Sequence, residues 1–449
     1  MAYDCLRTLI SSLEALRPAF TRPGFDNLLV VFVGWVLTGG PHAVTQALVA
    51  TGVAGRRHHE AFHRFFSRGT WDPDAVGRLL FASILRHVPE HAAIRLALDD
   101  TLAVKKGLSV FGIGTYKDPV RSSRRHVVLA FGHCWVVLAV LLPVPFSART
   151  FALPVLFRLH RTAKDCARTG HPHRKKTELA REMLDVIASW SGSRRVEIAA
   201  DGAYCNDTIT RDLPPNLVLF GSMRTDAVLT AAPPKLLWRL CGRPLKRGHG
   251  MPKPHELAND VRRPWLTCQA LLYGARRTIY FKTMDAQWYR ACGTRLLRIV
   301  VVRVDQGTIG IRVFFCTDPT VSVPVLLETY AERWSIEVCF RELKQLLGFG
   351  DSSARKRAAV ERVAPFVGFV YTSLVLWFAE GVHATPIATP PARPWYRHKR
   401  GLCFADALRA AQRTLAPLDV LDPRRSLANL RKSSRRAARP HETRAPRAA

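Results

Sequence analysis

Four polar residues late in the chain have a spacing that could serve chemistry on a phosphate ester. Tyr330, Arg333, Glu337 and Lys344 form the pattern Y-x2-R-x3-E-x6-K. At about 100° per residue, one helix through this stretch would carry all four side chains within roughly 60° of one another. Arg333 and Glu337 could be only an i,i+4 ion pair on a solvated helix face. The functional alternative is a carboxylate on a rigid helix that binds a divalent cation, beside cations that bind phosphates.

Two short apolar runs upstream each lead into aspartate. Ile94–Leu98 precedes Asp99 and Asp100, and Val196–Ala200 precedes Asp201. Buried strands of parallel sheets end at the edge where such sheets place their sites, although aspartate is also common in turns. Two aspartates and one glutamate supply the hard oxygen ligands that Mg²⁺ prefers, and such a set can hold two ions across a phosphodiester.

Taken together, these motifs resemble those of DDE insertion-sequence transposases of the Y-R-E-K type. The D-x-T spacing of Asp99 and Thr101 is similar to the first aspartate motif of that family, and the run AADGAY around Asp201 is similar to the second. A shift of one residue would exchange the roles of Asp99 and Asp100. The resemblance covers roughly residues 94–376.

The resemblance implies a reaction, its residues and its partners. The implied catalytic and metal-binding residues are Asp99, Asp201 and Glu337, and the implied DNA-binding residues are Tyr330, Arg333 and Lys344. Two Mg²⁺ ions, for which Mn²⁺ can substitute, would serve cleavage and strand transfer in cut-and-paste transposition. The expected partner is double-stranded DNA, both element ends and target, bound by a homodimer.

Two other classes of protein share part of this pattern. An RNase H-like nuclease without strand transfer would have the same acids but less need of the Y-R-E-K residues. A transposase-derived DNA-binding protein without activity would have a damaged set of acids, whereas all three are present here.

The periodicity of the remaining sequence predicts an α/β protein with an RNase H-like catalytic core. Predicted strands at His126–Phe131 and Cys134–Leu142 meet at a turn, and a predicted helix at Thr177–Trp190 precedes the strand at Val196–Ala200. A buried helix at Val363–Phe378 is expected to pack on the sheet. The predicted segments are a helical, DNA-contacting domain (1–85), the first part of the core (86–205), a mostly β insertion (206–325), the second part of the core with the Glu337 helix (326–380), and a proline-broken linker with a short helix and a basic tail (381–449).

Composition restricts the partners. The 449 residues include 67 Lys and Arg against 35 Asp and Glu, a net charge of +32. Such an excess predicts binding to a polyanion, either nucleic acid or an anionic membrane surface. Two apolar runs, Leu28–Leu37 and Pro365–Phe378, are too short to span a bilayer comfortably and predict buried helices. The ten cysteines show no C-x2-C pair, and residues 1–11 show no signal-peptide pattern. These features predict a cytoplasmic, nucleoid-associated bacterial protein with reduced thiols.

Overall fold

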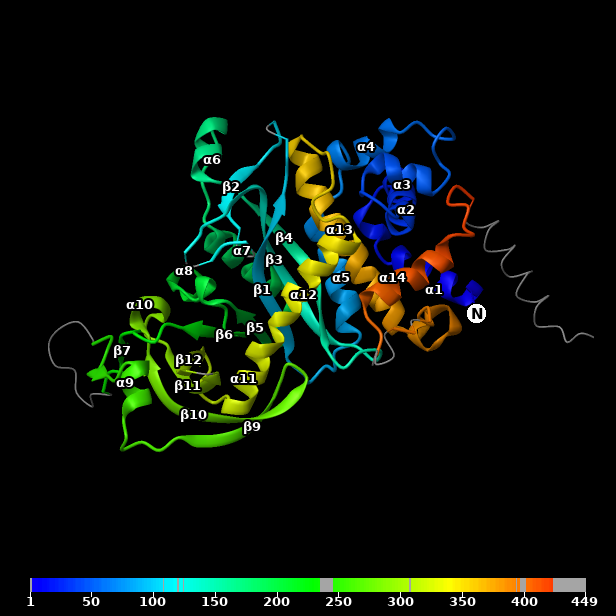
Figure 1. Ribbon diagram of the computed structural model, residues 1–449. Coiled ribbons are helices and arrows are strands. Elements are labelled where there is room, and N and C mark those ends of the chain that lie inside the picture. The colour runs from blue at the N-terminus through cyan, green and yellow to red at the C-terminus, as the bar shows by residue number, and fades with distance from the viewer. Residues whose placement is uncertain are drawn as a thin grey trace, which may run out of the picture. The chain divides into compact units, whose positions relative to one another are not determined.

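The computed structural model describes residues 2–107, 109–118, 121–123, 125–234, 245–306, 308–392, 394–395 and 401–422. Its contacts divide the chain into two units (Figure 1). The helical unit comprises the described parts of Met1–Leu80, Pro145–Ser147 and Glu342–Ala449, and the sheet unit comprises those of Phe81–Val144 and Ala148–Arg341. Each unit joins stretches that are distant in sequence, so neither coincides with one of the five predicted segments. The predicted basic tail, from residue 424 onward, lies outside the described residues.

The helical unit has its core around one long apolar helix. Its helices are α1 (Ala2–Glu14), η1 (Arg17–Ala19), α2 (Arg22–Leu37), α3 (Val44–Ala50), α4 (Glu60–Ser67), most of α5 (Pro73–Leu85), the end of α12 (Trp334–Leu346), α13 (Arg357–Ala379), η3 (Val382–Ala384), η4 (Pro386–Ala388) and α14 (Phe404–Leu415). By length and composition α13 could cross a membrane, but 83% of its most apolar window is buried. A helix that is apolar on every face is typical of a protein core.

Hydrogen bonds connect the N-terminal helices of this unit to its part after residue 342. The indole of Trp377 in α13 donates to the carbonyl of Cys5 in α1 at 2.9 Å, and that of Trp35 in α2 donates to Leu347 at 2.9 Å. Helix α13 packs against α1, α4 and α14. Its contacts place this helix in the core of the helical unit.

The sheet unit is built on five strands whose order is that of an RNase H-like core. The strands are β1 (Ile94–Val104), β3 (Leu129–Pro143), β4 (Thr150–His160), β5 (Val196–Ala200) and β6 (Leu217–Met223). β3 pairs antiparallel with both β1 and β4, whereas β1, β5 and β6 run parallel. Helix α7 (Lys176–Ser191) connects β4 to β5, after the short α6 (Ala163–Thr169). The predicted mixed α/β fold is confirmed, and β5 has the bounds predicted from the sequence.

The prediction of a turn at Gly132 was wrong. β3 runs unbroken through Gly132, and the short β2 (Gly114–Lys117) pairs with its first part. A Cβ at Gly132 would lie 2.2 Å from the carbonyl oxygen of Ala103 on β1. The glycine therefore allows two backbones to approach closely, which is the other common use of glycine in strands.

The mostly β segment after the core extends the same sheet. Its elements are α8 (Asp207–Thr210), β7 (Leu229–Thr230), β8 (Gly250–Met251), α9 (Pro254–Asn259), β9 (Leu266–Leu272), β10 (Ala275–Gln287), α10 (Tyr289–Cys292), β11 (Leu296–Gln306) and β12 (Thr308–Cys316). Because β12 pairs antiparallel with β6, the described strands form one 12-stranded sheet. β6 lies within the predicted insertion by residue number, but its parallel pairing with β5 makes it part of the core.

The stretch that carries the Y-R-E-K residues is two helices rather than one. α11 spans Val323–Glu332, α12 spans Trp334–Leu346, and Arg333 lies at the junction. Arg333 keeps right-handed helical dihedral angles, but its N–H donates to Tyr330, three residues earlier. The chain thus turns more tightly at this one residue, and a single helical wheel does not describe all four side chains. Ser322 is the N-cap of α11 and Pro324 lies in its first turn.

Candidate active site

Asp99 and Asp201 each come directly after the point where the pairing of two neighbouring parallel strands stops. The last paired residues of β1 and β5 are Leu98 and Ala200, and each aspartate follows directly. The sequence predicts that Asp99 ends its strand, yet β1 continues to Val104, paired only with β3. Asp99 is therefore held in a strand that pairs with β3 but, at this residue, no longer with β5.

Arg333 joins Asp99 to Glu337. One terminal nitrogen of its guanidinium donates to Oδ2 of Asp99 at 2.7 Å, and the other donates to Oε1 of Glu337 at 3.0 Å. The three side chains are 13% (Arg333), 19% (Asp99) and 34% (Glu337) exposed. Two carboxylates from β1 and α12 thus lie within reach of a single cation.

The environment of Asp99 raises its pKa to about 6. Burial is the largest cause, since it disfavours the charged carboxylate. The cation of Arg333 and the N–H of Asp100, which donates to Oδ1 at 2.8 Å, both oppose the rise, whereas the negative charges of Asp100 and Glu337 add to it. Asp99 is therefore a carboxylate whose ionisation depends on a nearby positive charge.

Asp201 is exposed and caps the short helix η2 (Gly202–Tyr204). Its Oδ1 accepts a hydrogen bond from the N–H of Gly202 at 2.7 Å. Burial lowers the pKa of Arg333, but nearby acidic groups, among them Asp99 and Asp201, raise it above its ordinary value. This electrostatic coupling places Asp201 in the same group of charges as the Asp99–Arg333–Glu337 cluster.

Tyr330 packs beside the same guanidinium. Its ring lies 4.7 Å from that of Phe314 on β12, and the guanidinium carbon of Arg333 lies 5.8 Å from its centroid. Burial raises the pKa of its phenol, which stays protonated at neutral pH. Lys344 is exposed near the end of α12 and belongs to the helical unit. The sheet unit therefore brings together five of the six residues singled out by the sequence.

Asp100 has different partners because successive side chains of a strand point to opposite faces. Its Oδ2 accepts from Nζ of Lys176 at 2.6 Å and from Sγ of Cys134 at 3.4 Å, and its Oδ1 accepts from the hydroxyl of Tyr204 at 2.8 Å. The sequence alone did not single out Lys176 and Tyr204 as partners of this acid. The signal in the sequence that could have revealed a second cluster was the adjacent pair of aspartates. Since side chains alternate along a strand, one of the two has to point away from the site.

The donor atoms of the cluster suit a hard divalent cation. Within the described part of the chain, no three His, Cys, Asp or Glu side chains are gathered closely enough to form a ready metal site. However, Asp99 and Glu337 already share one cation, the guanidinium of Arg333. Carboxylate oxygens are the ligands of Mg²⁺, so the chemistry of this set fits the ion that the sequence predicts.

Comparison with known proteins identifies the family. A family model described as DDE superfamily endonuclease matches residues 15–284, more than half of the 449 residues. The match includes Asp99 and Asp201 and ends before Glu337. No curated protein gives a match.

Among solved structures, a cryo-EM structure of the piggyBac transposase synaptic complex with hairpin DNA is similar to the chain at 10% identity and a TM-score of 0.44. That similarity covers 98% of this chain and 83% of the other. At this level it does not bear on function. On the family match over most of its length, the chain belongs to the DDE superfamily endonucleases.

Proposed function

We propose that the chain is a Y-R-E-K transposase that binds the ends of its own insertion element and performs metal-dependent DNA cleavage and strand transfer. Membership of the DDE endonucleases supports the cleavage step. The observation that carries the proposal is the convergence of Asp99 and Glu337 on one guanidinium, with Asp201 following the adjacent strand. An inactive descendant would have no need to keep three acids from three elements in one place.

Asp99, Asp201 and Glu337 are the proposed ligands of two Mg²⁺ ions, for which Mn²⁺ can substitute. Such ions, when bound, make an attacking oxygen more acidic and stabilise the leaving oxygen of a phosphodiester. The chain contributes rigid supports, since Asp99 extends from a paired strand and Glu337 from a helix. In the ion-free state Arg333 balances the negative charge of two of these groups.

Tyr330, Arg333 and Lys344 are the proposed contacts to DNA phosphates. A guanidinium released from the carboxylates can bind a phosphate through two parallel N–H donors, which a lysine cannot do. A transposase must hold one DNA end through successive reactions, and positioning errors of about 1 Å can cost on the order of a hundredfold in rate. These contacts therefore matter more for joining than for a first cut.

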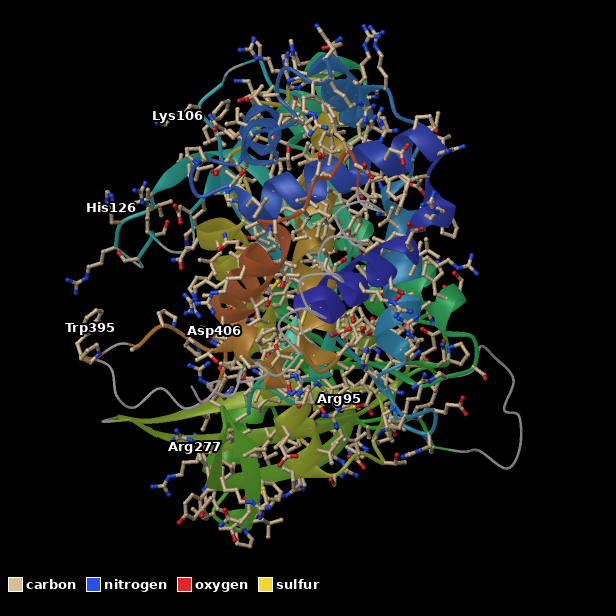
Figure 2. The ribbon with its side chains drawn as sticks, turned by 90° about the vertical axis from the view of Figure 1, so that its right-hand side faces the viewer. Arg95, Lys106, His126, Arg277, Trp395 and Asp406 are labelled. Atoms are coloured by element: carbon tan, nitrogen blue, oxygen red, sulfur yellow. The ribbon has the colours of Figure 1, made fainter. Side chains whose placement is uncertain are left out.

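The β9–β10 hairpin offers further groups to nucleic acid. Tyr273, Arg276 and Arg277 are exposed at and beside its turn, and Arg277 projects from the ribbon (Figure 2). Aromatic rings beside cations suit stacking on bases and attraction to phosphates. With the net charge of +32, these residues support double-stranded DNA, element ends and target, as the partner. The proposed form on the ends is a homodimer, located with nucleoid DNA in the cytoplasm.

The deciding experiment uses DNA from both sides of the coding sequence, joined in one plasmid, with Mg²⁺ or Mn²⁺ and with a chelator. We expect wild-type protein to cut at the element ends only with the ion. Asp99→Ala, Asp201→Ala and Glu337→Ala should each abolish cutting and leave end binding largely intact. Asp226→Ala is the control, because this exposed acid pairs with Arg224 in its own turn.

Pre-nicked ends then separate a transposase from a simple nuclease. We expect Lys344→Ala to retain nicking and lose strand transfer into a target plasmid disproportionately. Wild-type protein that cuts but never joins would establish a nuclease without strand transfer. Protein that binds the ends and never cuts would establish a DNA-binding protein without activity. Either result overturns the proposal.

A further inference from the structure

A second polar cluster lies on the other face of β1, behind the three acids. Asp100 accepts hydrogen bonds from Tyr204 at 2.8 Å and from Lys176 at 2.6 Å, and the thiol of Cys134 on β3 lies 3.4 Å away. Tyr204 is 1% exposed, so its hydroxyl is committed to this carboxylate. The cluster joins β1 to the start of α7 and to η2.

The positions of these residues in the chain give the cluster a mechanical consequence. Asp100 directly follows Asp99, and Tyr204 ends the short helix η2 that Asp201 caps. Backbone pairing between β1 and β5 stops at Leu98 and Ala200, one residue before both aspartates. Beyond that point the bond from Tyr204 to Asp100 connects the two segments that carry the proposed metal ligands.

We propose that Tyr204, Asp100 and Lys176 form a brace that holds Asp99 at a fixed distance from Asp201, so that both meet the same ions. This inference rests on the proposed function, since it assigns positioning residues to that site. Tyr204 holds the turn after β5, and Lys176 balances the charge that Asp100 adds behind Asp99. None of the three touches the reacting atoms.

A purely stabilising role predicts different results, and the chain offers a matched control. Tyr371 is also 1% exposed, and its hydroxyl also donates to a carboxylate, that of Glu342, at 2.8 Å. Tyr371→Phe therefore removes a tyrosine hydroxyl from a similar hydrogen bond to a carboxylate, but in the helical unit. Both variants should lower the Tm by a few degrees.

The experiment compares full-length wild type, Tyr204→Phe and Tyr371→Phe in two assays. The first is binding of Ca²⁺ and Mn²⁺, followed by the rise of Tm with ion concentration. The second is single-turnover cleavage of saturating end DNA across a range of Mn²⁺ concentrations. For Tyr204→Phe we expect weaker ion binding and cleavage slowed by about ten- to a hundredfold, with part of the loss recovered at high Mn²⁺. Tyr371→Phe should match wild type in both assays.

A double-mutant cycle tests whether Tyr204 acts through Asp100. Asp100→Asn, which keeps an acceptor oxygen of the same shape, should cause a smaller loss of ion affinity than Asp100→Ala. Once Asp100 is alanine, adding Tyr204→Phe should cost little more, because linked residues are not additive. Independent, additive losses would contradict the brace.

The outcomes separate the brace from the function on which it rests. If Tyr204→Phe behaves like Tyr371→Phe in ion binding, the brace is wrong even when wild-type protein cuts. If wild-type protein binds the ions and never cuts, the proposed function fails, and the ion titration still decides the brace. If wild-type protein binds no divalent ion, both are overturned.

Discussion

Removing the guanidinium of Arg333 tests the idea that this side chain stands in for metal between Asp99 and Glu337. The bond to Asp99 is largely buried and of the charge-assisted kind, which contributes about 1.5–3 kcal/mol. The bond to Glu337, which is 34% exposed, is discounted for solvent to about 0.2–1 kcal/mol. We therefore expect Arg333→Ala to lower the free energy of unfolding of the ion-free protein by about 2–4 kcal/mol.

Divalent ions should reverse this loss. Without Arg333, two carboxylates have no shared cation, so Ca²⁺ or Mg²⁺ should bind more tightly and raise the Tm more than in wild-type protein. Arg333→Lys should be intermediate, because a single ammonium group cannot reproduce the planar fork. The assay is thermal unfolding in chelator and in increasing Ca²⁺, which needs no catalytic activity.

Arg161→Ala is the matched control for this measurement. Arg161 is 12% exposed and its Nε lies 2.7 Å from Oδ2 of Asp165, so its loss should destabilise the sheet unit to a similar degree. Its response to Ca²⁺ should nevertheless equal that of wild type. If Arg333→Ala gains no more from Ca²⁺ than Arg161→Ala does, Arg333 does not occupy the place of the ion.

Three further predictions concern pH, packing and salt. The pKa of Asp99 is raised to about 6 from 3.8. The contribution of Asp99 to the free energy of unfolding of the ion-free protein is therefore fully present below about pH 4 and lost by about pH 6, a change of about 3 kcal/mol. Urea unfolding in chelator should therefore show wild type losing stability relative to Asp99→Asn over that interval, and parallel pH profiles would contradict the raised pKa. Lys282 is 4% exposed, and its Nζ donates to three carbonyl groups at the end of α9 at 2.8–3.1 Å. Lys282→Met should therefore lower the free energy of unfolding in urea by about 3 kcal/mol. Lys106 is exposed, so Lys106→Met should cost little. Deleting Arg424–Ala449 should flatten the dependence of duplex affinity on salt, since each phosphate contact contributes a slope of about −0.9, and an unchanged slope would place this tail off the DNA.

The sequence was informative about elements whose formation depends on their own residues and those next to them in the chain. The apolar run before Asp201 predicted β5 with the bounds observed, because a short buried strand is marked by its own residues. Ser322 before α11 and Pro324 in its first turn are likewise local signals of where that helix begins. The acid motifs in a strongly basic chain predicted a DDE transposase, and the family match confirmed the DDE endonuclease class.

The sequence did not reveal features that depend on contact with a part of the chain that is distant in sequence. Gly132 reads as a turn in the sequence, whereas its role is to let β3 approach β1. The sequence predicts a strand that ends in Asp99 and Asp100, yet pairing with β3 continues this strand to Val104. Local propensity is overridden in both cases by pairing with a strand that lies elsewhere in the chain.

The arrangement of the candidate site itself was decided by tertiary structure. Strand alternation requires Asp99 and Asp100 to face opposite ways, but it does not say which of them faces α12. Arg333, separated from Asp99 by 234 residues, lies against that acid, and Tyr204, separated from Asp100 by 104 residues, lies against the other. The residue types and their spacing are local properties that a sequence displays directly. Which charges meet depends on how distant strands and helices pack, because only the folded chain brings them within the few ångströms over which hydrogen bonds act.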